Sequence, residues 1–225
     1  MCFSAGASFT SGVILSAVSV ATARKVTHPS HRLFASIPAF FAFQQFAEGI
    51  LWLTLRSGGS DRLQASTTYI FLLMALVIWP SVIPLAMLKL EETRKRRFAL
   101  KIILSAGIVL SAYYLFCLFF FRVEPVINGF HIQYVNDFPK TLGYVAFGIY
   151  AIATIAPLFV SSVRKMYMFG LLILVSCFVT GVFYKEYLTS VWCFFAAMIS
   201  IVIYYIVSTV PTTVTSDELS VQGNS

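Results

Sequence analysis

Glu48 is the residue of this sequence that most strongly suggests chemistry, because it is an acidic residue in the middle of a long apolar run. Gln44, Glu48 and Trp52 follow one another at intervals of four, so a helix would place them on one face, with Gln45 beside them. A carboxylate inside a membrane is costly, points into the protein, and marks a functional site by default. A simpler interpretation is that the same face only fixes how helices pack.

Three further residues carry side chains of the kinds that bind metals or act as nucleophiles. Removal of the initiator methionine would leave Cys2 as the first residue, with its amine and thiol together as base and nucleophile or as a chelate. His131 lies in the longest gap between apolar runs, and Cys193 lies near the start of the last run. The simpler interpretations are small apolar side chains for the cysteines and a solvated loop histidine.

The expected depths of these residues bring them together. At 1.5 Å per residue, Glu48 would lie about 10 Å below the outer end of its helix and Cys193 about 9 Å below the start of its own. We therefore predict one shared site for a metal ion or small ligand, formed by Cys2, Glu48, His131 and Cys193. Zinc and copper accept these ligand types. The supporting polar or aromatic residues are predicted to be Gln44, Gln45, Trp52, Tyr134 and Trp192.

The composition requires a membrane around these residues. Of the 225 residues, 59% are hydrophobic and 11% are charged, whereas soluble domains carry about 25% charged residues. The expected fold class is therefore all-α, a polytopic membrane bundle of seven transmembrane helices, since unpaired backbone groups are too costly in lipid. The predicted spans are 6–23, 34–55, 66–88, 100–121, 141–162, 166–184 and 187–210.

The basic residues predict the orientation of this bundle. Cytoplasmic loops carry an excess of Lys and Arg, so the N-terminus is expected outside and the C-terminus inside a bacterial cytoplasmic membrane. The eleven basic residues then on the inner side are Arg24, Lys25, Arg32, Lys89, Arg94, Lys95, Arg96, Arg97, Lys101, Arg164 and Lys165. The five on the outer side are Arg56, Arg62, Arg122, Lys140 and Lys185.

Three segments outside the spans have their own predicted roles. Residues 122–140 mix aromatic, acidic and turn residues and are expected to cover the outer end of the bundle as a lid. Residues 211–225 are polar and are predicted to form a disordered cytoplasmic tail after the membrane domain of residues 1–210. The basic run 89–97 determines topology and could also bind an anionic lipid. The net charge of +7 does not indicate nucleic-acid binding, because the basic residues lie in these short gaps. A protein partner is left unknown.

Five stretches together resemble a family of small bacterial membrane proteins that begin with an MCFSA-x-ASF signature. The stretches are MCFSAGASF at 1–9, QQFAEG at 44–49, WPSVIPL at 79–85, HIQY at 131–134 and SVWCFFAA at 190–197. The resemblance covers most of the chain and ends at the tail. It implies that the stretches with the four predicted site residues belong to the family pattern, and it names relatives without naming a reaction.

Three functional hypotheses remain open from the sequence. The first is a buried polar site near the outer surface that binds a metal ion or small ligand, where hydrolytic or acyl-transfer chemistry on a lipid-like substrate could occur. The second is a proton- or cation-coupled transporter or channel that uses Glu48. The third is a non-catalytic membrane sensor or assembly factor. Against an enzyme, the sequence has no HExxH or GxSxG motif; against a transporter, it has no internal repeat.

Overall fold

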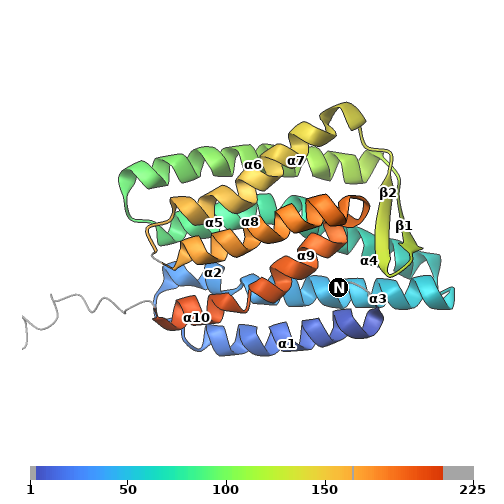
Figure 1. Cartoon of the computed structure of the whole chain (residues 1–225), viewed down its shortest axis with the longest axis horizontal. Helices are drawn as coiled ribbons and strands as arrows, with labels where there is room; N and C mark the ends of the chain where they lie inside the picture. Colours follow the sequence, from blue (N-terminus) through green and yellow to red (C-terminus); the bar gives the residue numbers. More distant parts are fainter. Residues whose placement is uncertain (1–3, 164, 210–225) are drawn as a thin grey trace, which may run out of the picture.

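A computed structural model describes residues 4–163 and 165–209 of the chain. Long helices lie side by side, and a β-hairpin covers one end of the bundle (Figure 1). Among the described residues, six helical runs are long and apolar enough to cross a membrane. The predicted tail of residues 211–225 lies outside the described part.

The elements follow one another along the chain with few long connections. Their bounds are α1 (Ala5–Ala23), η1 (Pro29–His31), α2 (Arg32–Ala35), α3 (Ile37–Ser57), α4 (Asp61–Leu72), η2 (Leu73–Ile78), α5 (Trp79–Leu90), α6 (Arg94–Phe120), β1 (Val123–Asn128), β2 (His131–Asn136), α7 (Lys140–Val160), α8 (Met166–Phe183), η3 (Lys185–Tyr187), α9 (Leu188–Ile199) and α10 (Val202–Thr209).

Helix α3 corresponds to the second predicted span, 34–55, but it is not one of the six apolar runs. Its 21 residues are enough to cross a bilayer. Three polar residues lower its hydropathy: Gln44, Gln45 and Glu48, all of them fully buried. Helix α3 contacts α1, α4 and α9, so these polar side chains are covered by protein.

Helices α1 and α3 pack closely because each offers a glycine to a phenylalanine of the other. A Cβ atom on Gly12 would lie 3.0 Å from the ring of Phe46, and one on Gly49 would lie 3.0 Å from the ring of Phe9. Small residues let membrane helices approach each other, where lipid supplies no hydrophobic drive. The two contacts fix α1 antiparallel to α3.

Three predicted spans have different ends in the structure. The span 66–88 belongs to a run of α4, η2 and α5 over residues 61–90. The span 100–121 belongs to α6, which begins at Arg94, so four of the five basic residues of the run 89–97 lie in the first turn of a helix. A helix of 27 residues is about 40 Å long and extends beyond the hydrocarbon core. The last span, 187–210, is divided into α9 and α10 at Ser200, whose hydroxyl bonds the Ala197 carbonyl at 2.6 Å.

The π-helical segment η2 interrupts the regular hydrogen bonding of its run. Two carbonyls in this segment accept hydrogen bonds from neighbouring helices. The Tyr150 hydroxyl donates to the Ala75 carbonyl at 2.5 Å, and the Ser111 hydroxyl donates to the Val77 carbonyl at 2.6 Å. These bonds attach α6 and α7 to η2, since buried backbone groups need partners in lipid.

The lid segment is a two-stranded antiparallel hairpin, so the all-α expectation is wrong for residues 123–136. Its turn is Gly129–Phe130, and Gly129 has a φ of +62°, which only glycine adopts readily. Glycine in the first position of a two-residue turn is a hairpin signal. Gly129 holds that position, and the all-α expectation did not take this signal into account.

A buried carboxylate ties two loops together at the end of the bundle opposite the hairpin. Glu91 accepts hydrogen bonds from the backbone amides of Thr93 at 3.0 Å and Ser162 at 2.7 Å. The Arg97 guanidinium donates to the carbonyls of Leu88 and Glu91 at 3.0 and 2.7 Å. The loop between α5 and α6 is thereby fixed to the loop between α7 and α8.

This arrangement predicts acid sensitivity. Burial opposes ionisation of Glu91, but the hydrogen bonds from Thr93 and Ser162 outweigh it and lower the pKa of the carboxyl below its ordinary value of 4.5. The stabilisation is present above that value and is lost as the pH falls through the lowered pKa. Glu91→Gln should cost about 1–3 kcal/mol near neutral pH and should flatten the acid dependence. Thermal melts in mild detergent from about pH 7 to about pH 3 measure both effects.

Glu92→Gln is the matched control, because Glu92 is exposed. Equal acid profiles for wild type and Glu91→Gln would contradict the role given to Glu91.

Candidate functional site

The centre of the candidate site is a hydrogen bond between α3 and α9. The Ser190 hydroxyl donates to a carboxylate oxygen of Glu48 at 2.6 Å, and both residues are fully buried. The bond joins two residues 142 positions apart in the chain, so it fixes the first part of the bundle to the last.

A second polar contact is made one helical turn along α3. The Trp79 indole nitrogen donates to the side-chain oxygen of Gln44 at 2.9 Å. The ring of Phe41 stacks on Trp79, with centroids 4.0 Å apart and planes 22° apart, and holds the indole in place. The Cys193 thiol interacts with the Gln44 side chain and lies within electrostatic range of Glu48. Gln44 therefore connects Trp79 on α5 with Cys193 on α9.

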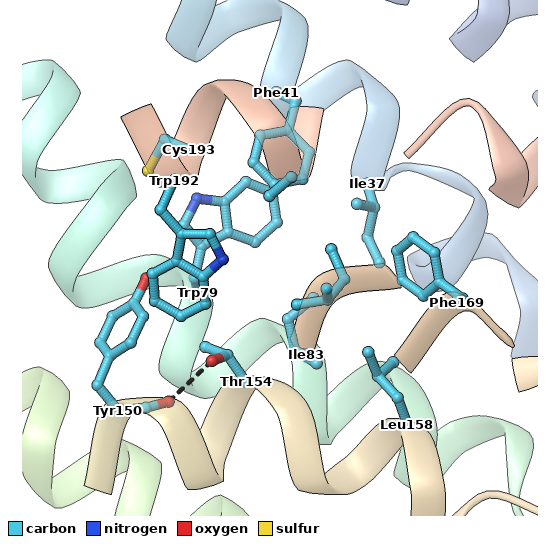
Figure 2. Close-up of a pocket in the computed structure, with 12 residues that line it drawn as sticks. Ile37, Phe41, Trp79, Ile83, Tyr150, Thr154, Leu158, Phe169, Trp192 and Cys193 are labelled. Carbon is cyan, nitrogen blue, oxygen red and sulfur yellow. Dashed lines mark hydrogen bonds between the residues drawn. The ribbon is translucent and has the colours of Figure 1, made fainter. Parts of the chain in front are cut away.

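Two small cavities meet beside these residues. The first, of about 40 Å³, is lined by apolar and aromatic side chains from α3, α5, α7, α8 and α9 (Figure 2). The second, of about 80 Å³, lies towards α6 and shares Tyr150, Trp192 and Cys193 with the first. Each volume exceeds the roughly 15 Å³ that one water molecule needs. There is room beside Cys193 for a small molecule.

Several buried side chains of α1, α3 and α9 have polar atoms with no hydrogen-bond partner among the residues described. They are the Ser8 hydroxyl, both amide atoms of Gln45, and the indole nitrogens of Trp52 and Trp192. Gln45 and Trp52 flank Glu48 on α3, and the α1–α3 register places Ser8 at nearly the same depth. Buried polar atoms are almost always hydrogen-bonded. Their concentration here marks a place suited to a polar ligand.

The β-hairpin covers the end of the bundle nearest this site. Ile132 is fully buried and packs with Leu51 and Trp52 of α3. Tyr134 stacks on Phe71 of α4, with ring centroids 5.1 Å apart. The side chains of β2 thus anchor the hairpin on two helices, and the hairpin closes the bundle above Trp52.

His131 begins β2 and lies against the connection between α8 and α9. Its ring centroid is 4.7 Å from that of Tyr187 and 5.3 Å from that of Tyr184. Burial lowers the pKa of His131 below its ordinary value of 6.5. The neutral imidazole, which is the form that binds metals, is therefore favoured near neutral pH.

The structure brings some of the predicted site residues together and leaves others apart or undescribed. Glu48 and Cys193 are both buried inside the bundle and within electrostatic range of each other, whereas His131 lies on the hairpin. Cys2 lies outside the described residues. In the part of the chain that is described, no three His, Cys, Asp or Glu side chains are grouped closely enough to hold a metal ion. The shared four-residue site stays a prediction.

Two residues of the site were missed by the sequence argument. Ser190 is a buried partner of Glu48, and Trp79 is the partner of Gln44. A serine or a tryptophan in an apolar run has no diagnostic spacing. A weak signal exists for Ser190, because it lies one helical turn before Cys193 and so shares a face with it.

The architecture is compatible with a helical membrane protein. Among the described residues, six helical runs are long and apolar enough to cross a membrane, and the Glu48 carboxylate is buried among helices. Within that class, the chain belongs to the family of unknown function DUF6629, whose profile matches residues 1–218. No curated protein and no solved structure matches the chain.

Proposed function

We propose that the protein is an integral membrane protein that binds a metal ion or small polar ligand at Glu48, beneath the hairpin. The observation that carries the proposal is the fully buried Glu48 side chain, which accepts a hydrogen bond from Ser190 and lies within electrostatic range of the Cys193 thiol. Intramembrane carboxylates are expensive and usually functional. The unpartnered atoms of Ser8 and Gln45 add hydrogen-bonding groups to the same region.

The position of Ala5 limits how far Cys2 can lie from the hairpin. Ala5, the first residue of α1, packs with Trp52 and Ile132 at the base of the hairpin. Cys2 precedes Ala5 by three residues, a distance of at most about 11 Å along an extended chain. This short distance supports the proposal that Cys2 and His131 complete the site with Glu48 and Cys193. Thiolate, carboxylate and imidazole ligands favour zinc or copper over magnesium or calcium.

Native mass spectrometry of protein purified from membranes in mild detergent tests this function. We expect the wild-type protein to carry a bound metal ion or small molecule, and elemental analysis of the same sample distinguishes the two. Glu48→Gln keeps the shape of the side chain but removes its capacity for a negative charge. The affinity for the bound species, read from the fraction of protein that carries it, should therefore fall by about tenfold or more.

The control is Cys177→Ser, which changes a buried cysteine of α8. It should leave the bound mass unchanged. A wild-type protein with no bound mass, or one whose Glu48→Gln variant keeps all of it, would refute the proposal.

We further propose that the chain crosses a bacterial cytoplasmic membrane seven times, with α3 as the seventh crossing and the hairpin outside. The ends of α1 and α5 and the start of α6, which carry Arg24, Lys89 and the basic run from Arg94 onward, lie at the end of the bundle opposite the hairpin (Figure 1), and this supports the orientation. A reporter active only in the cytoplasm should work when fused after residue 210. Alkaline phosphatase, active only outside, should work when inserted at Gly129–Phe130. The reverse pattern of activities would invert the orientation.

A further inference from the structure

A groove on the outside of α6 and α7 is separate from the Glu48 site. Helix α7 crosses α6 obliquely, and the two helices are in contact (Figure 1). Between them lies a groove of about 480 Å³, lined by Ala106 and Val109 of α6 and by Leu142 and Val145 of α7, among others. Val109 and Val145 are 71% and 59% exposed. The groove therefore opens away from the protein interior, toward the bilayer.

The chemistry of the lining suits a hydrocarbon chain. Ser105 and Tyr113 are the only lining residues with a polar side-chain group. The Ser105 hydroxyl donates to the Lys101 carbonyl of its own helix at 2.9 Å, which satisfies it locally. A polar headgroup would have to lie beyond the end of the groove.

Basic residues stand where such a headgroup would lie. One face of α6 leads into the groove. It carries Lys95, Phe98 and Ile102, which follow one another at intervals of three and four residues. Lys101 lies one turn, about 6 Å, before Ser105. Lys95 and Lys101 are both exposed, and long lysine side chains extend along apolar surface to place their charge at the headgroup level.

We propose that an anionic phospholipid binds along α6, with one hydrocarbon chain in the groove and its phosphate at Lys95 and Lys101. The groove supplies the apolar part of the site and the two ammonium groups supply the charge complementarity. Arg97 is not part of this site, because the carbonyls of Leu88 and Glu91 hold its guanidinium. The lipid belongs to the leaflet on the basic side of the protein.

The test counts lipids bound to the purified full chain in native mass spectrometry. Phosphatidylglycerol and phosphatidylcholine with identical acyl chains are titrated into the same detergent. Each basic residue near an anionic headgroup contributes roughly fivefold to binding. The wild-type protein should therefore prefer phosphatidylglycerol by about tenfold or more, and Lys95→Gln/Lys101→Gln should bind both lipids alike.

Two controls separate a site from general attraction to a basic surface. Arg24→Gln/Lys25→Gln removes the same charge from exposed positions beyond α1 at the same end of the bundle and should keep the preference. Val145→Trp fills the groove and should weaken retention of both lipids, whereas Val175→Trp on the exposed face of α8 should not.

Three outcomes would overturn the proposal. They are an equal affinity of the wild-type protein for the two lipids, an equal loss of preference in the two double variants, and unchanged lipid retention in Val145→Trp.

Discussion

Glu48→Lys is expected to prevent the protein from folding into a stable bundle. A lysine near the middle of a span costs about 2.5–3.5 kcal/mol on insertion scales. Inside the folded protein, the ammonium would also face the Ser190 hydroxyl and replace its acceptor. Together these costs approach the whole stability of a marginal protein, about 5–15 kcal/mol. Membrane yield and the elution profile in mild detergent, followed by a thermal melt, measure the result.

Two variants serve as controls for this prediction. Glu48→Gln retains a hydrogen-bonding group of similar shape and should fold, with a melting temperature within a few degrees of the wild type. Glu92→Lys makes the same charge change at an exposed position and should have little effect. If Glu48→Lys expresses and melts like the wild type, Glu48 does not face the interior and the candidate site is wrong.

Gly107→Ala is expected to destabilise the bundle more than any other alanine substitution of a helical glycine in the described chain. The added Cβ atom would overlap the carbonyl oxygen of Pro80. That carbonyl belongs to the backbone of α5 and cannot rotate away as a side chain could. Pro84 has no N–H group to bond it within the helix, so the oxygen projects toward α6. Overpacking of this kind costs about 1–3 kcal/mol, and we expect the upper part of that range.

Thermal melts of the purified variant in mild detergent test this expectation. The matched control is Gly148→Ala on α7, where an added Cβ would meet no atom within 4 Å. Alanine is favoured over glycine in a helix by about 0.5–1 kcal/mol, so the control should be neutral or slightly stabilising. Similar melting temperatures for the two alanine variants would show that α5 and α6 are not held at this close distance.

The sequence alone predicted most of the helical runs that are long and apolar enough to cross a membrane. The apolar runs are long and their ends are charged, so hydropathy places elements such as α1 and α8 within a residue or two. It also determined that the face of α3 with Gln44 and Glu48 turns inward, because helical spacing and the cost of a charge in lipid leave no alternative. Residues 61–65 and 94–99 were not assigned to helices. Hydropathy detects only the apolar part of a helix and misses polar turns that extend beyond it.

The tertiary structure decided which groups meet. Ser190 bonds to Glu48 and Trp79 bonds to Gln44 because packing sets the rotation and crossing angle of α3, α5 and α9. No spacing in the sequence predicts that rotation. The contact of Gly107 with the Pro80 carbonyl depends in the same way on the distance between α5 and α6. Residues far apart in the chain become neighbours only through the summed packing of whole helices, so their pairing could not be predicted from either segment alone.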